Sequence, residues 1–178
     1  MELLRIGHKL ISRTRVYRRV DEILRLRSEG RSQQETADLL DVDRTFVSRI
    51  EALGEVRKGG KVALVGFPIK NKAELERAAL DEGVDYVLLF TEKERRQFAE
   101  HISGAQLVNE VMGISAKLRS FDAVLFLGSD MRLEMVESLI GREIVVGMEI
   151  GASPITRDVE VDIAHIVSVL RSLRSINA

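Results

Sequence analysis

Apolar side chains in the first third of the chain recur every three or four positions, which is the spacing of an amphipathic helix. Val20, Ile23 and Leu24 share one face of a helix that we predict over about 16–28, and Gly30 ends it. Two further helices are predicted over about 33–41 and 44–53. This part of the chain therefore predicts a three-helix module.

The predicted helix boundaries carry capping residues. Ser32 and Glu35 have the spacing of a capping box, in which each side chain satisfies a free amide of the other residue. Asp43 is a suitable N-cap for the third helix, and Gly54 closes it. The stretch 54–60 is short, polar and glycine-rich, which predicts a linker.

The rest of the chain alternates short apolar runs with helical stretches. Continuous runs of this kind are typical of strands that helices cover on both faces, and hence of a parallel sheet. Strands are predicted over 62–66, 84–90, 123–127 and 144–148. Helices are predicted over about 72–82, 92–120 with a break near Gly104 or Gly113, and 131–140. Asn71–Glu74 and Thr91–Glu94 have cap spacing directly after strands.

The expected fold is therefore α/β in two domains. Residues 1–58 form an all-α helix-turn-helix module, and residues 61–178 form a small three-layer, Rossmann-like domain around a parallel sheet.

The pattern of 34–53, QETADLLDVDRTFVSRIEAL, resembles the helix-turn-helix of bacterial transcription regulators, broadly the phage-repressor-like class. Ala37 supplies the small side chain that a close approach of two helices requires. Val47 and Ile50 give the second helix a buried face. The family usually has glycine at the turn where this chain has Asp41, a residue that tolerates left-handed backbone better than most.

The resemblance implies double-stranded DNA as a partner. The residues that it places toward the major groove face outward on the second helix, and an arginine there most often contacts guanine. They are Arg44, Thr45, Ser48 and Arg49. Gln33 and Gln34 would lie beside the phosphate backbone. We expect Phe46 to pack in the core of the module rather than against a thymine methyl group.

A basic segment before the motif contains four closely spaced arginines, namely Arg13, Arg15, Arg18 and Arg19. They either lie along phosphates, which would add a salt-dependent contribution to affinity, or form an ordinary solvated helix face. Residues 1–60 hold 13 basic and 10 acidic side chains, whereas residues 61–178 hold 14 and 18, so positive charge is concentrated in the N-terminal part. We therefore include all four in the predicted DNA interface.

Small and polar residues follow the predicted strands, at the sheet edge where parallel sheets bind ligands. The candidates for a ligand pocket are Gly66, Thr91, Gly128, Ser129, Asp130, Arg132, Glu149 and Ser153. Arg132 could clamp a carboxylate or phosphate. The other explanation is that every α/β fold needs turn glycines and polar caps at these places.

Ile163, Ile166, Val167, Leu170 and Leu173 form one apolar stripe of a predicted helix over 162–173. The stripe is either a dimer seam or the face of a helix that covers the sheet. A dimer is expected in any case, because one recognition helix contacts only a few base pairs.

The composition excludes several classes of function. The chain has no cysteine, its net charge is −1, and no apolar run is long enough to span a membrane. Phosphate-loop and dinucleotide motifs are lacking, and the three histidines are scattered without partners at metal spacing. We expect a cytoplasmic protein with no catalytic residues, no metal, no cofactor and no membrane partner.

The sequence thus predicts a dimeric, sequence-specific transcription regulator whose α/β domain could sense a small-molecule effector. One alternative is an α/β nucleotide- or metabolite-binding protein or enzyme whose helical module contacts a protein partner. Another is a DNA-binding adaptor without an effector.

Overall fold

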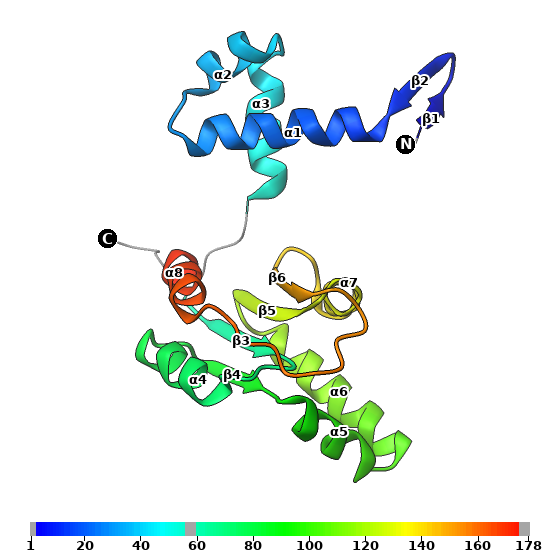
Figure 1. Ribbon diagram of the computed structural model, residues 1–178, viewed down its shortest axis with the longest axis vertical. Helices are drawn as coiled ribbons and strands as arrows, with labels where there is room; N and C mark the ends of the chain where they lie inside the picture. The colour runs from blue at the N-terminus through cyan, green and yellow to red at the C-terminus, as the bar shows by residue number, and fades with distance from the viewer. Residues whose placement is uncertain (1–2, 56–59, 175–178) are drawn as a thin grey trace. The chain divides into compact units, whose positions relative to one another are not determined.

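The computed structural model describes residues 3–55 and 60–174, which form two compact units (Figure 1). The first unit ends at Glu55, and the second comprises the rest of the chain. Residues 56–59, which make up most of the predicted linker, lie outside the described residues. The division between the units falls within that predicted linker.

The first unit consists of a β-hairpin followed by three helices. Its elements are β1 (Leu3–Ile6), β2 (Lys9–Ser12), α1 (Arg13–Ser28), α2 (Gln33–Leu40) and α3 (Arg44–Gly54). The three helices match the predicted ones closely. The prediction of an all-α N-terminal module is nevertheless wrong, because residues 3–12 form the hairpin.

The hairpin has a local cause. β1 and β2 pair antiparallel around the two residues Gly7 and His8. Gly7 has a φ of 59°, a conformation that glycine adopts without the penalty of a Cβ atom and that two-residue hairpin loops require. Apolar residues on both sides of a glycine-containing pair are the sequence signal for this structure. The helical spacing of apolar residues, on which our prediction was based, begins only after Ser12.

Side-chain caps set the helix boundaries of this unit. The Ser12 hydroxyl accepts a hydrogen bond from the Arg15 amide at 3.3 Å, so α1 begins at Arg13 rather than near residue 16. The predicted capping box is confirmed: the Ser32 hydroxyl accepts from the Glu35 amide, and the Glu35 carboxylate accepts from the Ser32 amide. These contacts satisfy amides that the first turn of a helix leaves free.

The second unit is an α/β domain with a four-stranded parallel sheet, so the predicted α/β class is confirmed. Its strand order is β4-β3-β5-β6. Its elements are β3 (Val62–Gly66), α4 (Lys72–Asp81), β4 (Tyr86–Leu89), α5 (Glu92–Glu100), α6 (Gly104–Leu118), β5 (Ala123–Ser129), α7 (Asp130–Ile140), β6 (Val145–Gly151) and α8 (Ile163–Arg174).

Helices lie on both faces of this sheet (Figure 1). α4 and α8 cover one face, where Leu75 and Leu170 are buried against Leu64 and Leu125. α6 and α7 cover the other face. All residues of the central strands β3 and β5 are buried, as their continuous apolar runs predict.

The edge strand β6 departs from that prediction. Val146, Met148 and Ile150 pack against the α4–α8 side, whereas the alternating residues Gly147 and Glu149 are exposed. The Leu133 side chain of α7 lies over Gly147 on the other face, so β6 is covered there only in part, as expected for a strand at the edge of the sheet. The strand also runs to Gly151, three residues beyond the predicted end.

Two helix starts differ from their predicted signatures. The Asn71 side chain makes no cap bond; it binds the backbone of Val161 instead, donating to the carbonyl at 2.9 Å and accepting from the amide at 3.0 Å. The break expected within 92–120 lies just before Gly104, where Ser103 and Gln106 form a capping box. The Thr91–Glu94 box is confirmed.

The apolar stripe near the C-terminus is buried within its own domain. Ile166, Leu170 and Leu173 contribute to the core between α8, α4 and the sheet. Of the two alternatives for this stripe, the sheet-covering helix is the one that the structure contains. These side chains are therefore not available as a dimer seam.

Candidate functional site

Three buried side chains hold the helices of the first unit together. Ile23 of α1, Ala37 of α2 and Val47 of α3 form its core, with Leu40 and Ile50 half-buried around them. Ala37 lies where α2 and α3 meet, as its small size predicts. The core buries one side of α3 and leaves the opposite side in solvent.

The turn between α2 and α3 has the geometry that the sequence requires. Asp41 lies in the left-handed region at φ 50° and ψ 54°, a conformation that aspartate tolerates better than most residues. The Asp43 carboxylate accepts the Thr45 amide at 2.6 Å, so it caps α3 as predicted. Hydrogen bonds from the Thr45 side chain and from its amide, with a smaller contribution from the nearby Arg49 charge, lower the pKa of Asp43.

A polar network links all three helices. Glu51 of α3 accepts hydrogen bonds from Arg27 of α1 and, at 2.7 Å, from the Gln33 side chain of α2. These two donors lower the pKa of the Glu51 carboxyl group. Gln33 was predicted at the phosphate backbone, but its amide group is engaged within the module. Its neighbour Gln34 bonds Asp38 at 2.8 Å on the exposed side of α2.

The outward face of α3 is polar and exposed to solvent. Arg44, Thr45, Ser48 and Arg49 are all exposed. Among the described residues, neither the Arg44 nor the Arg49 side chain makes a hydrogen bond or an ion pair. Their donors are therefore available to an external acceptor.

Phe46 lies on this outward face as well. Its side chain is 41% exposed, so the prediction that it packs in the module core is wrong. Val47 is the next residue and is fully buried. Adjacent residues on a helix point about 100° apart, so Phe46 points away from the direction of Val47.

The basic residues of α1 divide into two groups. Arg15 and Arg18 are exposed, and no ion pair joins either of them to another described residue. Arg19 pairs with Glu22 at 3.2 Å, and Arg13 donates to the Tyr17 hydroxyl at 2.5 Å. Of these four arginines, Arg15 and Arg18 are the two that none of these contacts involves.

The predicted residues at the strand ends form a small hydrogen-bonded cluster rather than an open pocket. The Ser129 and Ser153 hydroxyls are 2.7 Å apart, and the Asp130 carboxylate accepts the Ser153 amide at 2.9 Å. The Thr91 hydroxyl is used in its capping box. Glu149 is exposed on β6.

The two strand-end glycines are explained by packing. A Cβ atom on Gly66 would lie 3.0 Å from the Cβ of Leu127, and one on Gly128 would lie 2.5 Å from the Phe126 ring. Both positions therefore need glycine for reasons internal to the sheet. Of the eight predicted ligand residues, only Arg132 lines the cavity described next.

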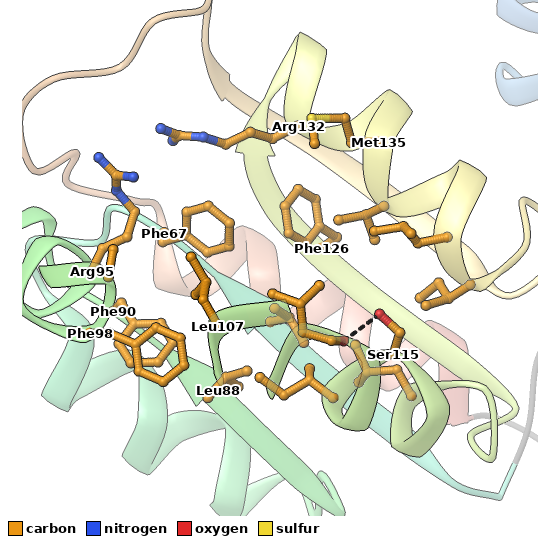
Figure 2. Close-up of a pocket in the computed structure, with 18 residues that line it drawn as sticks. Phe67, Leu88, Phe90, Arg95, Phe98, Leu107, Ser115, Phe126, Arg132 and Met135 are labelled. Carbon is orange, nitrogen blue, oxygen red and sulfur yellow. Dashed lines mark hydrogen bonds between the residues drawn. The ribbon is translucent and has the colours of Figure 1, made fainter. Parts of the chain in front are cut away.

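A cavity of about 350 Å³ lies on the α6–α7 side of the sheet (Figure 2). Its walls are aliphatic and aromatic side chains from β3, β4, β5 and helices α5 to α7. They include Phe67, Phe90, Phe98 and Phe126. The Ser115 hydroxyl, which lies at its margin, donates to the Val111 carbonyl of the same helix at 2.7 Å. The walls therefore offer almost no polar group.

The exceptions are two arginines. Figure 2 shows the guanidinium groups of Arg95 and Arg132 at the same end of the cavity, beside Phe67. The Arg132 Cζ lies 5.1 Å from the centre of the Phe67 ring, and its Nη1 is buried without a hydrogen-bond partner among the described residues. Burial, followed by repulsion from Arg95, lowers the pKa of Arg132. Arginine nevertheless stays charged.

Arg95, in contrast, is paired. Its guanidinium group makes a bidentate contact with Glu92 at 2.9 and 2.8 Å, and Arg96 donates to the same carboxylate at 2.8 Å. The hydrogen bond from Arg95 is the largest cause that holds the pKa of Glu92 at about 2. The Asp158 carboxylate accepts the Glu92 amide at 2.6 Å. Arg132 is thus the cation at this end that lacks a carboxylate partner.

Sequence reasoning missed most of the cavity. Arg95, Phe98 and Val111 lie on α5 and α6, outside the short segments after the strands in which the ligand residues were predicted. Their signal is the apolar face of the predicted helical stretch 92–120. The cavity depends on how far α5, α6 and α7 lie from one another and from the sheet, and spacing along the chain does not reveal that distance.

The described residues contain neither a candidate membrane-spanning helix nor a candidate metal site. No described helix has both the length and the apolar character to cross a membrane. Among residues 3–55 and 60–174, no group of three or more histidine or carboxylate side chains could hold a metal ion. No protein family, curated protein or solved structure matches the chain.

Proposed function

We propose that the chain is a sequence-specific DNA-binding transcription regulator whose α2–α3 pair acts as a helix-turn-helix. The observation that carries the proposal is the outward face of α3. It presents the free donors of Arg44 and Arg49 with the hydroxyls of Thr45 and Ser48. Such donors read base edges in the major groove, where arginine makes bidentate contacts with guanine.

The support of α3 favours this use. Its opposite side is anchored by Val47, its N-terminus is capped by Asp43, and Glu51 connects it to α1 and α2. A helix held in this way presents its polar face in one orientation, which base readout requires. Phe46, exposed on the same helix, would contact a thymine methyl group.

The exposed cations of α1 would add affinity without specificity. Arg15 and Arg18 would contact phosphates and release counterions, which makes binding depend on salt. Gln34 stays in the proposed backbone contact, whereas Gln33 would act by holding α2 against α3. Since Arg13 and Arg19 already have intramolecular partners, their contribution to DNA binding would be smaller.

A homodimer belongs to the proposal, because one recognition helix reads only a few base pairs. Its interface must lie outside the buried stripe of α8. The α/β unit would carry the dimer contact and a small-molecule effector site. Effector control would then require different affinities of the ligand for two dimer states.

One observation favours a different function. Besides Phe46, the first unit exposes Leu39 and Leu53, and exposed apolar groups of this kind can bind proteins. The alternative is a metabolite-binding α/β protein whose helical unit contacts a protein partner. In that case the α3 arginines would not select a DNA sequence.

The test is selection of bound fragments from random double-stranded DNA across a salt series. The parent is compared with an Arg44→Ala, Arg49→Ala double variant. An Arg77→Ala, Arg157→Ala double variant is the control, since it makes the same charge change at exposed positions of the second unit. We expect the parent and the control to enrich one palindromic sequence, and the α3 variant to lose it. Equal enrichment by all three, or none by any, would refute the proposal.

A further inference from the structure

The cavity on the α6–α7 side combines an apolar interior with one arginine, Arg132, that has no ion pair among the described residues. Its volume of about 350 Å³ is near the lower end of the ~300–1,000 Å³ typical of small-molecule sites. Such sites are mostly apolar with a few convergent polar groups. Here the polar groups converge at one end, where Arg95 and Arg132 lie (Figure 2).

The charge at that end is unevenly distributed. Glu92 is shared by Arg95 and Arg96, and the Glu92 amide is bound to Asp158. No described carboxylate lies within ion-pair distance of Arg132. A buried guanidinium nitrogen without an acceptor is costly, because it has lost water and gained no partner. An anionic group at this position would supply the missing acceptor.

Along the rest of the cavity, the exposed wall residues are apolar and favour an apolar part of the ligand. Val111, Met135 and Leu139 line it and are each more than a third exposed. Covering these side chains with an alkyl chain removes apolar surface from water, which favours binding. A small hydrophilic anion would leave that surface exposed and would use only the arginine.

We propose that this cavity binds an amphipathic organic anion of medium size, with its carboxylate or phosphate head group at the Arg132 guanidinium group and its apolar body between α6, α7 and the sheet. The proposal extends the effector-sensing part of the proposed function. The binding site itself stands on the geometry of the second unit and does not depend on DNA binding.

The head group is tested by calorimetric titration of the full chain with octanoate, octyl phosphate and octanol. We expect at least one of the two anions to bind with one site per chain and at least tenfold more tightly than octanol. The better of the two anions identifies the head group. Equal affinity for octanol would overturn the assignment of an anionic ligand, as would failure of both anions to bind.

The role of Arg132 is tested with Arg132→Gln. A hydrogen bond to a charged group corresponds to roughly a tenfold to hundredfold change in affinity, so the variant should lose that much for the anion and nothing for octanol. Arg77→Gln, an exposed arginine on α4, is the matched control and should bind like the parent. Equal anion affinity in Arg132→Gln and the parent would refute the assignment.

The cavity itself is tested by filling it. Val111→Trp and Val108→Trp place the same bulk on the same helix, but only Val111 lines the cavity. We expect Val111→Trp to abolish anion binding and Val108→Trp to preserve it, with both variants retaining the parent's circular dichroism. If both variants bind like the parent, the ligand lies elsewhere and the proposal fails.

Sedimentation of the same variants separates this proposal from occupation by a second copy. If the parent protein is a dimer and binds none of the probes, and if Val111→Trp is the one variant that is monomeric, then a surface of a second copy fills the cavity and the proposal fails. DNA affinity, measured with and without octanoate, is a separate readout. Loss of DNA binding by Arg44→Ala, Arg49→Ala with intact titration would leave the cavity assignment unaffected.

Discussion

The two units of this chain solve the problem of stability in different ways. The first has three fully buried apolar side chains, Ile23, Ala37 and Val47. The second buries β3 and β5 completely between two layers of helices. The small unit therefore depends on a few apolar contacts together with a polar network, whereas the large unit has enough core to contain a cavity.

Both units carry paired and unpaired arginines. In the second unit, Arg95, Arg96 and Arg171 contact carboxylates, whereas Arg77, Arg132 and Arg157 make no ion pair with a described residue. In the first, Arg15, Arg18, Arg44 and Arg49 make no ion pair with a described residue. Because these arginines make no ion pair, their replacement should not lower the stability of the first unit. They are thus the natural positions for contacts with an external anion.

The largest expected effect compares equivalent core truncations. Ile23→Ala and Ile69→Ala each remove a fully buried isoleucine, at a cost of about 2–5 kcal/mol. We expect Ile23→Ala to unfold the first unit at room temperature while the second stays folded, and Ile69→Ala only to lower the melting temperature of the second. Differential scanning calorimetry resolves the two transitions. A joint shift of both transitions in either variant would show that the units unfold cooperatively.

The second comparison concerns Glu92 in the second unit and Glu51 in the first, because each carboxylate accepts hydrogen bonds from two side chains. The pKa of Glu92 is about 2 in the folded chain, below the usual value near 4.5. Its stabilising contribution is therefore complete above about pH 4.5 and is lost as the pH falls toward 2, up to about 3 kcal/mol. Urea unfolding between pH 6 and pH 2 should show a loss of stability that is smaller in Glu92→Gln than in the parent by this amount.

Glu51 gives the matching measurement in the first unit. Its pKa is also lowered, by Arg27 and Gln33, so its contribution has the same sign of pH dependence. Both partners in the Arg27–Glu51 pair are more solvent-accessible than Glu92, and the effect should be smaller. If Glu51→Gln unfolds with the parent's pH profile, the network does not stabilise the three helices.

These examples show what the sequence could and could not predict. Contacts within a few residues were predictable, such as the Ser32 and Thr91 capping boxes and the Asp43 cap, because spacing alone defines them. Continuous apolar runs predicted β3 and β5 for the same reason. The Arg27–Glu51–Gln33 network and the Asn71–Val161 contacts join positions far apart in the chain. No local pattern encodes such contacts.

The candidate sites follow the same division. The outward face of α3 could be predicted, because Val47 and Ile50 lie three residues apart on one face and helical periodicity places Thr45, Ser48 and Arg49 away from that face. Phe46 was misplaced because aromatic residues are usually buried, and the core here is too small to hold it. The cavity was missed because it depends on the distance between helices, whereas Arg132 was found from its place after a strand.

Phosphate contacts should give a smaller effect than the α3 arginines. If Arg15 and Arg18 lie on the DNA backbone, Arg15→Ala, Arg18→Ala weakens binding to all sequences alike. It should also make the slope of log affinity against log salt about 2 units shallower. Binding isotherms at several salt concentrations, on the selected site and on a scrambled one, measure both quantities. A change in sequence preference with an unchanged slope would assign these arginines to base readout instead.

The smallest expected effect is a gain in stability in the first unit. Thr36 is fully buried in α2, and its hydroxyl has no hydrogen-bond partner among the described residues. Thr36→Val keeps the shape of the side chain and removes the unsatisfied group, and valine and threonine have similar helix propensities. The variant should stabilise the first unit by about 1 kcal/mol, which calorimetry would detect as a higher melting temperature of that transition alone. Destabilisation would mean that the hydroxyl is bound by water, and that the core of the first unit is wetter than its three buried side chains suggest.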